Sequence, residues 1–446
     1  MGGGLMQLVA YGSQDIYLTG QPQITFFKSV YRRHTNFAVE SIQQTINGSV
    51  APGSRVSVTV SRNGDLLKNL WIEYDPSVVI TANGSALACD FSHALLEQLE
   101  LEIGGQLIDR QYGLWLTVWR ELSECNPTGM QARLHWSAQE PPYPNNGDDT
   151  SMKESWELPT KYQKMAFTHR GYPTQSGNSS YAPKRAYVPM AFWFCRNPGL
   201  AVPLIALQYH EVKFNIQFAQ LSQFVLGSAT VSLSSVQVYA DYVYLDTTER
   251  RQFAQNAHEY LIDQLQYQQE SATTNTGETI RLNFNHPVKE LIWVGTPKPV
   301  SEDDIYNTNV IVSGGATPQP IIGSVGPYHD GPAQSSLTSK IVLNGTDRFT
   351  ERHLTYFTRN QIWDCHTGFG ATASYDSIGV YSFALRPEEH QPSGTCNFSR
   401  IDTAQLVFNN AAINNQTVGV NALTIFAVNY NVLRIMSGMG GLAYSN

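Results

Sequence analysis

The densest group of chemically reactive side chains lies in residues 383–402, which read FALRPEEHQPSGTCNFSRID. This short span contains two adjacent carboxylates, an imidazole and a thiol. Together they could ligate a transition metal, and the thiol and imidazole could form a nucleophile pair. The side chains are those of Glu388, Glu389, His390 and Cys396.

The backbone around these side chains argues against such a site. Pro387, Pro392 and Gly394 predict a rigid turn rather than a helix that presents ligands on one face. No second cluster of carboxylates or histidines completes a ligand set. We therefore predict that the two glutamates and the histidine are structural residues of a loop. Its carboxylates can accept backbone N–H bonds or pair with Arg across a domain or subunit contact.

Other catalytic signatures are missing or weak. The sequence has no G-x-x-x-x-G-K-[ST], no H-E-x-x-H and no H-x-H. GMGGLA (438–443) resembles a dinucleotide fingerprint, but no helix can follow it so near the C-terminus, and we expect a flexible tail. The adjacent pairs His210 with Glu211 and His258 with Glu259 are expected to be structural. We predict no catalytic residues, no metal site and no cofactor, so the protein is not expected to be an enzyme.

Composition and charge limit the class of protein. The 446 residues are 42% hydrophobic and only 15% charged, so the chain can bury large cores, and its length favours two domains. A net charge of -8 provides no positive field to attract nucleic acid, and we expect none to bind directly. The one basic cluster, FFKSVYRRH (26–34), is short and is interpreted as a solvated or anchoring edge.

The compartment expected from the sequence is the cytosol. The cysteines are scattered without a C-x-x-C, which fits free thiols better than a disulfide framework or a zinc site. The N-terminus has no signal-peptide pattern and no membrane-spanning run, and Met6 fails the myristoylation pattern. The N-x-S/T triplets therefore predict nothing about glycan positions. The cysteines are Cys89, Cys125, Cys195, Cys365 and Cys396, and the triplets begin at Asn47, Asn83, Asn178, Asn344, Asn397 and Asn415.

Alternation of apolar and polar residues predicts mainly β-structure. Residues 56–60 alternate in this way, as strands with one buried face do. Two segments show helical spacing instead. Apolar residues share one helical face in 114–122, and a short helix is expected between the two halves of the chain at 247–259. Asp246 and Glu249 would form the capping pair of that second helix.

The chain also carries an internal duplication. LELEIGGQLIDRQYGLWL (99–116) resembles SKIVLNGTDRFTERHLTYF (339–357), because each has a β-rich run, a two-residue turn, an Asp-Arg pair and an aromatic segment. VQVYADYVYL (236–245) similarly matches TIFAVNYNVL (424–433). The stretch of chain between the two matched segments is longer in the first half than in the second. The additional residues fall in 139–190, which is rich in loop residues. We predict a loop excursion there and two successive all-β halves, either sandwiches or jelly rolls.

Long irregular segments carry a resemblance to a known family. They include QLVAYGSQDIYLTGQPQITFFKSVYRRHTNFAVESIQQT (7–45), FWFCRNPGLAVPLIALQYHEVKF (192–214), LDTTERRQFAQNAHEYLI (245–262) and the segment 383–402. The sequence resembles the major capsid proteins of nucleocytoplasmic large DNA viruses, most closely those of algal viruses. The likeness covers nearly the whole chain.

This resemblance implies an all-β double jelly roll, with two tandem eight-stranded barrels and a few short helices. It implies an N-terminal inner-face segment over 1–25, a first jelly roll over 26–248, a second over 249–440 and a tail over 441–446. The excursion at 139–190 would then contribute to the outer towers.

The resemblance further implies a major capsid protein whose homotrimers form pseudo-hexagonal capsomers of an icosahedral shell. Its partners would be neighbouring capsomers, minor capsid and penton proteins and the internal viral membrane, with surface glycans at positions the sequence does not give. Lys28, Arg32 and Arg33 would lie on the inner face. The protein would be synthesised and assembled in the host cytoplasm and reside in the virion.

Two other classes of protein fit the sequence less well. A jelly-roll lectin or glycosidase would need a single barrel, with two facing carboxylates for hydrolysis. A penton protein also has a single barrel, so the duplication favours the major capsid protein. Phe192, Trp193 and Phe194 could contribute to a trimer interface, although core packing is the favoured use of these aromatic residues.

Overall fold

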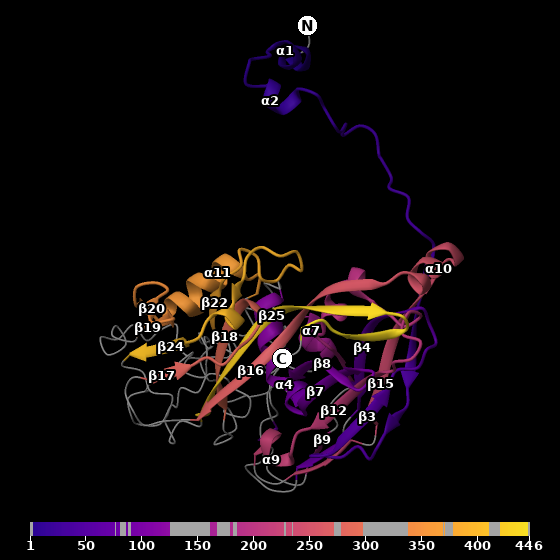
Figure 1. Ribbon diagram of the computed structural model, residues 1–446, viewed down its shortest axis with the longest axis vertical. Helices are drawn as coiled ribbons and strands as arrows, with labels where there is room; N and C mark the ends of the chain where they lie inside the picture. The colour runs from indigo at the N-terminus through magenta and orange to yellow at the C-terminus, as the bar shows by residue number, and fades with distance from the viewer. Residues whose placement is uncertain are drawn as a thin grey trace, which may run out of the picture. The chain divides into compact units, whose positions relative to one another are not determined.

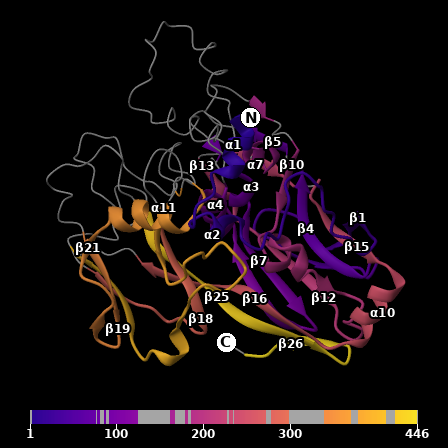
Figure 2. The same cartoon turned by 90° about the horizontal axis from the view of Figure 1, so that it is seen from above.

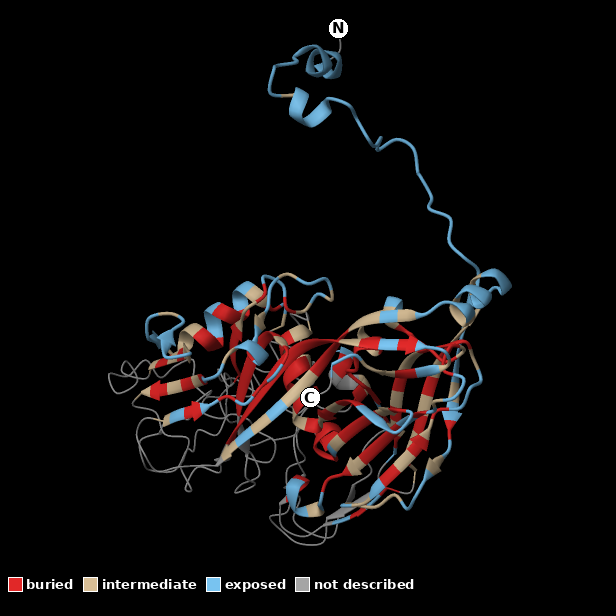
Figure 3. Ribbon diagram, in the orientation of Figure 1, coloured by how far each residue is buried: buried red, intermediate tan, exposed pale blue. Residues whose placement is uncertain are grey.

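The computed structural model describes residues 3–75, 77–80, 86–87, 91–124, 161–166, 179–181, 185–226, 229–233, 235–271, 278–297, 338–368, 370, 378–409 and 420–444. The chain divides into two compact units, Met1–Phe37 and Ala38–Asn446. The N-terminal unit contains α1 (Gly3–Val9) and α2 (Ile16–Thr19). Its described side chains are exposed apart from the half-buried Asp15, so they form no core of their own (Figure 3).

The larger unit begins with two sheets that we call the first barrel (Figure 1). One sheet has the strand order β1-β15-β4-β10, with β11 also paired to β4, and the other has the order β2-β3-β12-β7-β8. The strands of the first sheet are β1 (Phe37–Gln44), β4 (Leu66–Tyr74), β10 (Ala186–Pro189), β11 (Val202–Pro203) and β15 (Gln237–Leu245). Those of the second are β2 (Ile46–Asn47), β3 (Arg55–Thr59), β7 (Leu96–Ile103), β8 (Gln106–Tyr112) and β12 (Val212–Phe218).

Two further sheets form the second barrel. One has the order β16-β25-β18-β22, with β23 on β18 and β26 on β25, and the other has the order β17-β24-β19-β20, with β21 on β19. The first comprises β16 (His258–Ser271), β18 (Pro287–Pro297), β22 (Ile378–Ser382), β23 (Cys396–Asn397), β25 (Val420–Met436) and β26 (Met439–Leu442). The second comprises β17 (Glu278–Arg281), β19 (Thr338–Leu343), β20 (Thr346–Asp347), β21 (Arg352–His353) and β24 (Ala404–Asn409).

The two barrels repeat the same strand order, which confirms the predicted duplication. The hairpins β7–β8 and β19–β20 occupy corresponding places and both close with two-residue turns. In both turns the central residues have positive φ angles, 60° and 82° at Gly104 and Gly105 and 49° and 76° at Asn344 and Gly345. Such turns match the twist of the flanking strands, and Gly or Asn adopts them at low cost.

The helices are short and lie mostly between strands. The predicted helix in 114–122 is confirmed as α4 (Gly113–Ser123), and the helix between the barrels is confirmed as α10 (Thr247–Gln255), although it ends four residues early. Asp246 stands at the N-cap of α10 but makes no capping hydrogen bond, so the predicted capping pair was wrong. The other helices and turns are α3 (Phe91–Ala94), α7 (Lys161–Ala166), α8 (Trp193–Arg196), α9 (Leu221–Phe224), α11 (Gln361–Cys365), a π-helical turn (Tyr356–Asn360) and two 3-10 turns (Pro198–Leu200, Phe398–Arg400).

The remaining described strands are small and flank the first barrel. Two sheets, β13-β6 and β14-β5-β9, contain β5 (Ser77–Ile80), β6 (Ala86–Leu87), β9 (Ser179–Tyr181), β13 (Val225–Leu226) and β14 (Ala229–Ser232). Among the described helices, none is long and apolar enough to cross a membrane.

Apolar packing joins the two barrels. Alternate residues of the strands are buried inside each barrel (Figure 3). Ile262, Ile292 and Phe426 of the second barrel belong to the same buried cluster as the core of the first. Phe192 and Trp193 are also buried in this cluster, as is Phe194, which confirms core packing as their use. A continuous apolar core therefore couples the two halves.

The predicted flexible tail was wrong for its described part. Residues 439–442 form β26, which pairs with β25. Asn431 Nδ2 also donates a hydrogen bond to the backbone oxygen of Tyr444 at 2.9 Å. The glycines that were interpreted as a sign of flexibility instead allow side chains of the first barrel to pack closely against the backbone of β26. A Cβ on Gly440 would lie 2.7 Å from the Leu207 side chain.

Contacts divide the chain after Phe37, so residues 26–37 belong to the N-terminal unit of the structure. The start of the first jelly roll at residue 26 stays a prediction. Within the predicted excursion, β9 pairs with β5 at 179–181, and β10 joins the first barrel by pairing with β4 from residue 186. Apart from 161–166, 179–181 and 185–190, the excursion at 139–190 lies outside the described residues.

Candidate functional site

The predicted loop residues occupy the connection between β22 and β23, but their side chains do not converge. Glu388 is turned inward with 18% of its side chain exposed, whereas Glu389 is half exposed and pairs with Arg386 at 3.1 Å. The Nδ1 of His390 is buried and has no hydrogen-bond partner among the described residues. Burial raises the pKa of the Cys396 thiol, which disfavours a nucleophilic thiolate.

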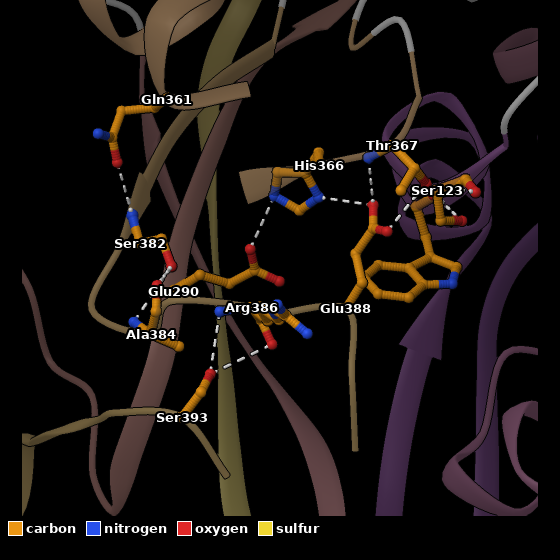
Figure 4. Close-up of polar contacts among 11 residues, drawn as sticks. Ser123, Glu290, Gln361, His366, Thr367, Ser382, Ala384, Arg386, Glu388 and Ser393 are labelled. Carbon is orange, nitrogen blue, oxygen red and sulfur yellow. Dashed lines mark hydrogen bonds and ion pairs between the residues drawn. The ribbon is translucent and has the colours of Figure 1, made fainter. Parts of the chain in front are cut away.

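Glu388 holds the segment that follows α11. Its Oε1 accepts a hydrogen bond from the backbone N–H of Thr367 at 3.0 Å, and its Oε2 accepts one from the Thr367 hydroxyl at 2.9 Å (Figure 4). The same Oε1 lies 3.1 Å from His366 Nδ1. A carboxylate in a turn between two prolines thus fixes an irregular piece of backbone.

His366 is a fully buried imidazole between two carboxylates. Its Nε2 lies 3.0 Å from Glu290 Oε2 and its Nδ1 faces Glu388, so elements β18, α11 and the 383–402 loop meet at one ring (Figure 4). The Glu290 contact is an ion pair without good hydrogen-bond alignment. Burial alone lowers the pKa of His366, but the two carboxylates outweigh it and raise the pKa from 6.5 to about 9. The ring is therefore an imidazolium at neutral pH.

The segment beyond His366 caps a helix of the first barrel. The last carbonyl groups of a helix have no partner inside the helix. Here Gly370 N–H donates to Glu121 O at 2.9 Å, and Gly368 N–H donates to Leu122 O at 2.6 Å. The Thr367 hydroxyl reaches Ser123 O at 3.2 Å. The last carbonyl groups of α4 thus find their hydrogen-bond donors in the second barrel.

A second polar cluster crosses between the barrels nearby. Arg196 of α8 lies 3.4 Å from Asp263 Oδ2 of β16, and Lys289 of β18 lies 3.1 Å from the same oxygen. The Arg196 guanidinium also stacks over Trp119, 4.7 Å from the ring centroid. Burial lowers the pKa of Lys289, partly offset by Asp263. Two cations around one carboxylate give this buried group a specific geometry.

The edge strands β8 and β16 form a third contact. Leu265 N–H donates to Asp109 Oδ1 at 3.1 Å, and Gln264 Nε2 donates to Ile108 O. Burial raises the pKa of Asp109 to about 7. Aromatic rings add to the contact in two pairs: Tyr112 with Tyr267, whose centroids are 4.3 Å apart, and Trp115 with Phe426, 5.2 Å apart.

The C-terminal hairpin forms a fourth contact with the first barrel. Tyr209 N–H donates to Gly438 O at 3.0 Å, and His210 Nδ1 lies 2.9 Å from Gly440 O. The neighbouring His258 bonds the Phe253 carbonyl at 2.7 Å. His210 and His258 thus both have local polar contacts. The described residues contain no group of three side chains placed to hold a metal.

We call the joint the set of four contacts between the barrels. They are residues 367–370 on the end of α4, Arg196 with Asp263, β8 with β16, and residues 438–440 with residues 209–210. Sequence reasoning singled out Glu388 but missed Glu290, His366 and Gly368. Their partners lie far away in the chain, and the local signal was the glycine-rich stretch CHTGFG (365–370) after a helix. Lys28, Arg32 and Arg33 are not part of the joint. They are exposed in the N-terminal unit.

The two adjacent glutamates are expected to contribute differently to stability, because only Glu388 takes part in the joint. We expect Glu388→Gln to lower the free energy of unfolding by about 2 kcal/mol, because charge-assisted bonds to His366 and Thr367 are lost. The matched Glu389→Gln should change it by less than about 0.5 kcal/mol, because its pair with Arg386 is exposed. Urea unfolding of both variants measures the difference, and equal losses would contradict this assignment.

Comparisons with known proteins place this architecture in a family. The chain is 44% identical to the major capsid protein of Pyramimonas orientalis virus, with all of both chains covered. The family model described as large eukaryotic DNA virus major capsid protein matches residues 249–441, and that described as major capsid protein N-terminus matches residues 25–246. The chain belongs to this family of viral major capsid proteins.

Other members of this capsid family support the same assignment. The major capsid protein of Paramecium bursaria Chlorella virus 1 is 43% identical over the whole of both chains. The structure of PBCV-1 VP54, fitted into a reconstruction of the virophage Sputnik, has a TM-score of 0.68 at 38% identity and covers 95% of this chain and 100% of that one. The Faustovirus major capsid protein, at 12% identity and a TM-score of 0.65 over 97% and 96% of the chains, shares the fold. The two barrels are thus a double jelly roll, as predicted.

Proposed function

We propose that this major capsid protein forms homotrimers that serve as pseudo-hexagonal capsomers in the icosahedral shell of a large double-stranded DNA virus. The observation that carries the proposal is the repeated strand order of two barrels locked by the joint. Three chains with two similar barrels each present six similar units around one axis. Such a trimer can occupy a hexagonal lattice, provided that the two barrels keep a fixed relation.

The partners follow from the same proposal. Neighbouring capsomers would contact the sides of the trimer, while minor capsid and penton proteins and the internal membrane would meet its inner face. The N-terminal unit suits such contacts, because it combines exposed apolar side chains such as Phe26 and Phe27 with Lys28, Arg32 and Arg33. The net charge of -8 disfavours direct contact with nucleic acid.

Localisation and surface features complete the proposal. The protein would be synthesised and assembled in the host cytoplasm and would function in the virion. The excursion at 139–190 would contribute to the outer towers, with surface glycans at positions that remain to be mapped. The role is structural: the polar groups of the joint are committed to holding backbone and helix ends in place.

The oligomeric state tests this function. We expect the purified chain of 49.6 kDa to sediment as a stable trimer of about three times that mass. Analytical ultracentrifugation at micromolar concentration is the measurement. A strict monomer that cleaves sugars would contradict the capsid function and favour a glycosidase.

A further inference from the structure

The polar cluster of Arg196, Asp263 and Lys289 contains a lysine that is almost wholly out of water. Only 1% of the Lys289 side chain and 7% of the Asp263 side chain are exposed, and Lys289 Nζ lies 3.1 Å from Asp263 Oδ2. Taking two charges out of water costs free energy that their attraction does not fully return, so a buried ion pair is a weak source of stability. Stability alone therefore does not account for this pair.

The two side chains belong to strands that do not pair with each other. Asp263 is in β16 and Lys289 is in β18, and β25 lies between these strands in the sheet (Figure 2). Asp263 is opposite Tyr430 of β25, and the pairing of β18 with β25 shifts its register at Lys289. Lys289 Nζ lies over the Tyr430 ring, 5.0 Å from its centroid. The lysine side chain therefore reaches across the central strand to the carboxyl group.

Burial makes the amine of Lys289 a better nucleophile. It lowers the pKa of Lys289, and the neighbouring Asp263 offsets this effect only in part. A lower pKa raises the fraction of neutral amine, which is the form that attacks a carbonyl carbon. The two groups are also held in contact in a site that excludes water. Both conditions favour condensation of an amine with a carboxylic acid.

The two carboxyl oxygens of Asp263 have different surroundings. Oδ2 lies 3.4 Å from the guanidinium of Arg196, whereas Oδ1 is buried and has no hydrogen-bond partner among the described residues. A cation beside Oδ2 stabilises the negative charge that develops there when a nucleophile attacks Cγ. Oδ1 has no such contact to lose, so it is the oxygen that can leave.

We propose that Lys289 and Asp263 condense to an isopeptide bond that links β18 covalently to β16. Lys289 Nζ attacks Asp263 Cγ, so that the Nζ–Cγ bond forms and the Cγ–Oδ1 bond breaks. Two of the three ammonium protons leave with Oδ1 as one water molecule, and the third stays on the amide nitrogen. Ion pair and products have the same net charge, and the step needs no oxidant, reductant or second substrate. Oδ2 becomes the amide oxygen and keeps its contact with Arg196.

His390 supplies a carrier for the proton that moves from Nζ to Oδ1. Its Nδ1 is buried without a hydrogen-bond partner among the described residues, and the charges of Asp263 and Lys289 both act on the ring. Burial lowers the pKa of His390, so the imidazole is neutral at neutral pH and can accept a proton. The Tyr430 hydroxyl donates to the His390 backbone oxygen at 3.3 Å, which holds this residue near the pair.

The bond would strengthen the second barrel where it contacts the first. A covalent link between distant residues restricts the unfolded chain, as a disulfide does. Unlike a disulfide, an isopeptide bond forms without an oxidising compartment, and the described cysteines Cys195, Cys365 and Cys396 are free thiols. The link lies within one chain, so the inference does not depend on the trimer proposed above.

Mass spectrometry of the unfolded full chain tests this inference. We expect a mass below that of the sequence by about 18 Da, the one water lost when the amide forms, and a branched peptide that joins the segments around Asp263 and Lys289 after digestion. The matched control lies in the same protein. Lys340 Nζ is 3.0 Å from Asp347 Oδ2, but 28% and 49% of these side chains are exposed, so no branched peptide should contain them.

Variants test the parts of the reaction. Lys289→Arg keeps a cation but has no amine, so the chain should have its full sequence mass. In a time course after cell-free synthesis, Arg196→Gln should slow formation of the branched peptide at least about tenfold. The exposed Arg434→Gln should leave the rate unchanged.

The wild-type chain provides the decisive result, so a variant that fails to fold does not affect it. A wild-type chain at its full sequence mass would overturn the inference. So would a mass deficit without a branched peptide, because cyclisation of Asp263 onto its own backbone loses the same water without joining two strands.

Discussion

Gly368→Ala is expected to lower the free energy of unfolding by about 3 kcal/mol, through overpacking and the loss of backbone hydrogen bonds. A Cβ at Gly368 would lie 2.2 Å from the backbone oxygen of Glu121 and 2.5 Å from the carbonyl carbon of Leu122. These are backbone atoms of α4 that cannot move aside as a side chain can. The methyl group must therefore push the segment away from the helix end that it caps.

Urea unfolding and crystallography of the Gly368→Ala variant measure this effect. The control is Gly12→Ala, because the nearest atom to a Cβ there is Asp15 Oδ2 at 3.6 Å, an ordinary contact. That change should alter stability by less than about 0.5 kcal/mol. Wild-type stability in Gly368→Ala would mean that the second barrel does not cap α4.

Local patterns in the sequence were sufficient to predict several of the strands and the main helix. Alternation at 56–60 identifies β3 because side chains of a strand point to opposite faces, and the apolar face of 114–122 identifies α4. The repeated Gly-Gly and Asn-Gly turns marked corresponding hairpins, since both need positive φ angles. The duplication and the all-β class therefore followed from short-range physics.

The joint could not be predicted in the same way, because it depends on residues distant in sequence. Glu388 was singled out for its turn, yet its role is set by His366 and by Thr367, whose hydroxyl group also reaches a carbonyl at the end of α4 in the other barrel. The GMGG stretch was wrongly interpreted as flexible because glycine serves both mobility and close packing. Only the position of Leu207 against Gly440 distinguishes these uses. The residue type is known from the sequence, whereas its structural role depends on the tertiary packing around it.

Raising the pH from 6.5 to about 9 is expected to remove the stability that His366 contributes, roughly 3 kcal/mol. The folded-state pKa of His366 is about 9, above the ordinary 6.5, because Glu290 and Glu388 outweigh the cost of burial. The native state therefore holds a proton that the unfolded state releases between these values. The contribution is fully present below pH 6.5 and is lost as the pH rises through 9.

The variant His366→Gln isolates this contribution. At neutral pH it should be about 3 kcal/mol less stable than wild type, because the imidazolium between two buried carboxylates is lost. That difference should shrink as the pH rises toward 9, since wild-type His366 then becomes neutral too. Lys289 has the opposite dependence, because burial lowers its pKa, but it is present in both chains and cancels in the difference.

Urea unfolding of both chains from about pH 6 to about pH 10 measures the difference between wild type and His366→Gln. Arg434→Gln serves as a control, because its pair with Glu259 is exposed and should give a small difference that is constant over this range. A large difference for His366→Gln that did not change with pH would show that packing, rather than charge, holds the ring. Because the same imidazolium orders the segment that caps α4, loss of its charge should also loosen the contact between the two barrels.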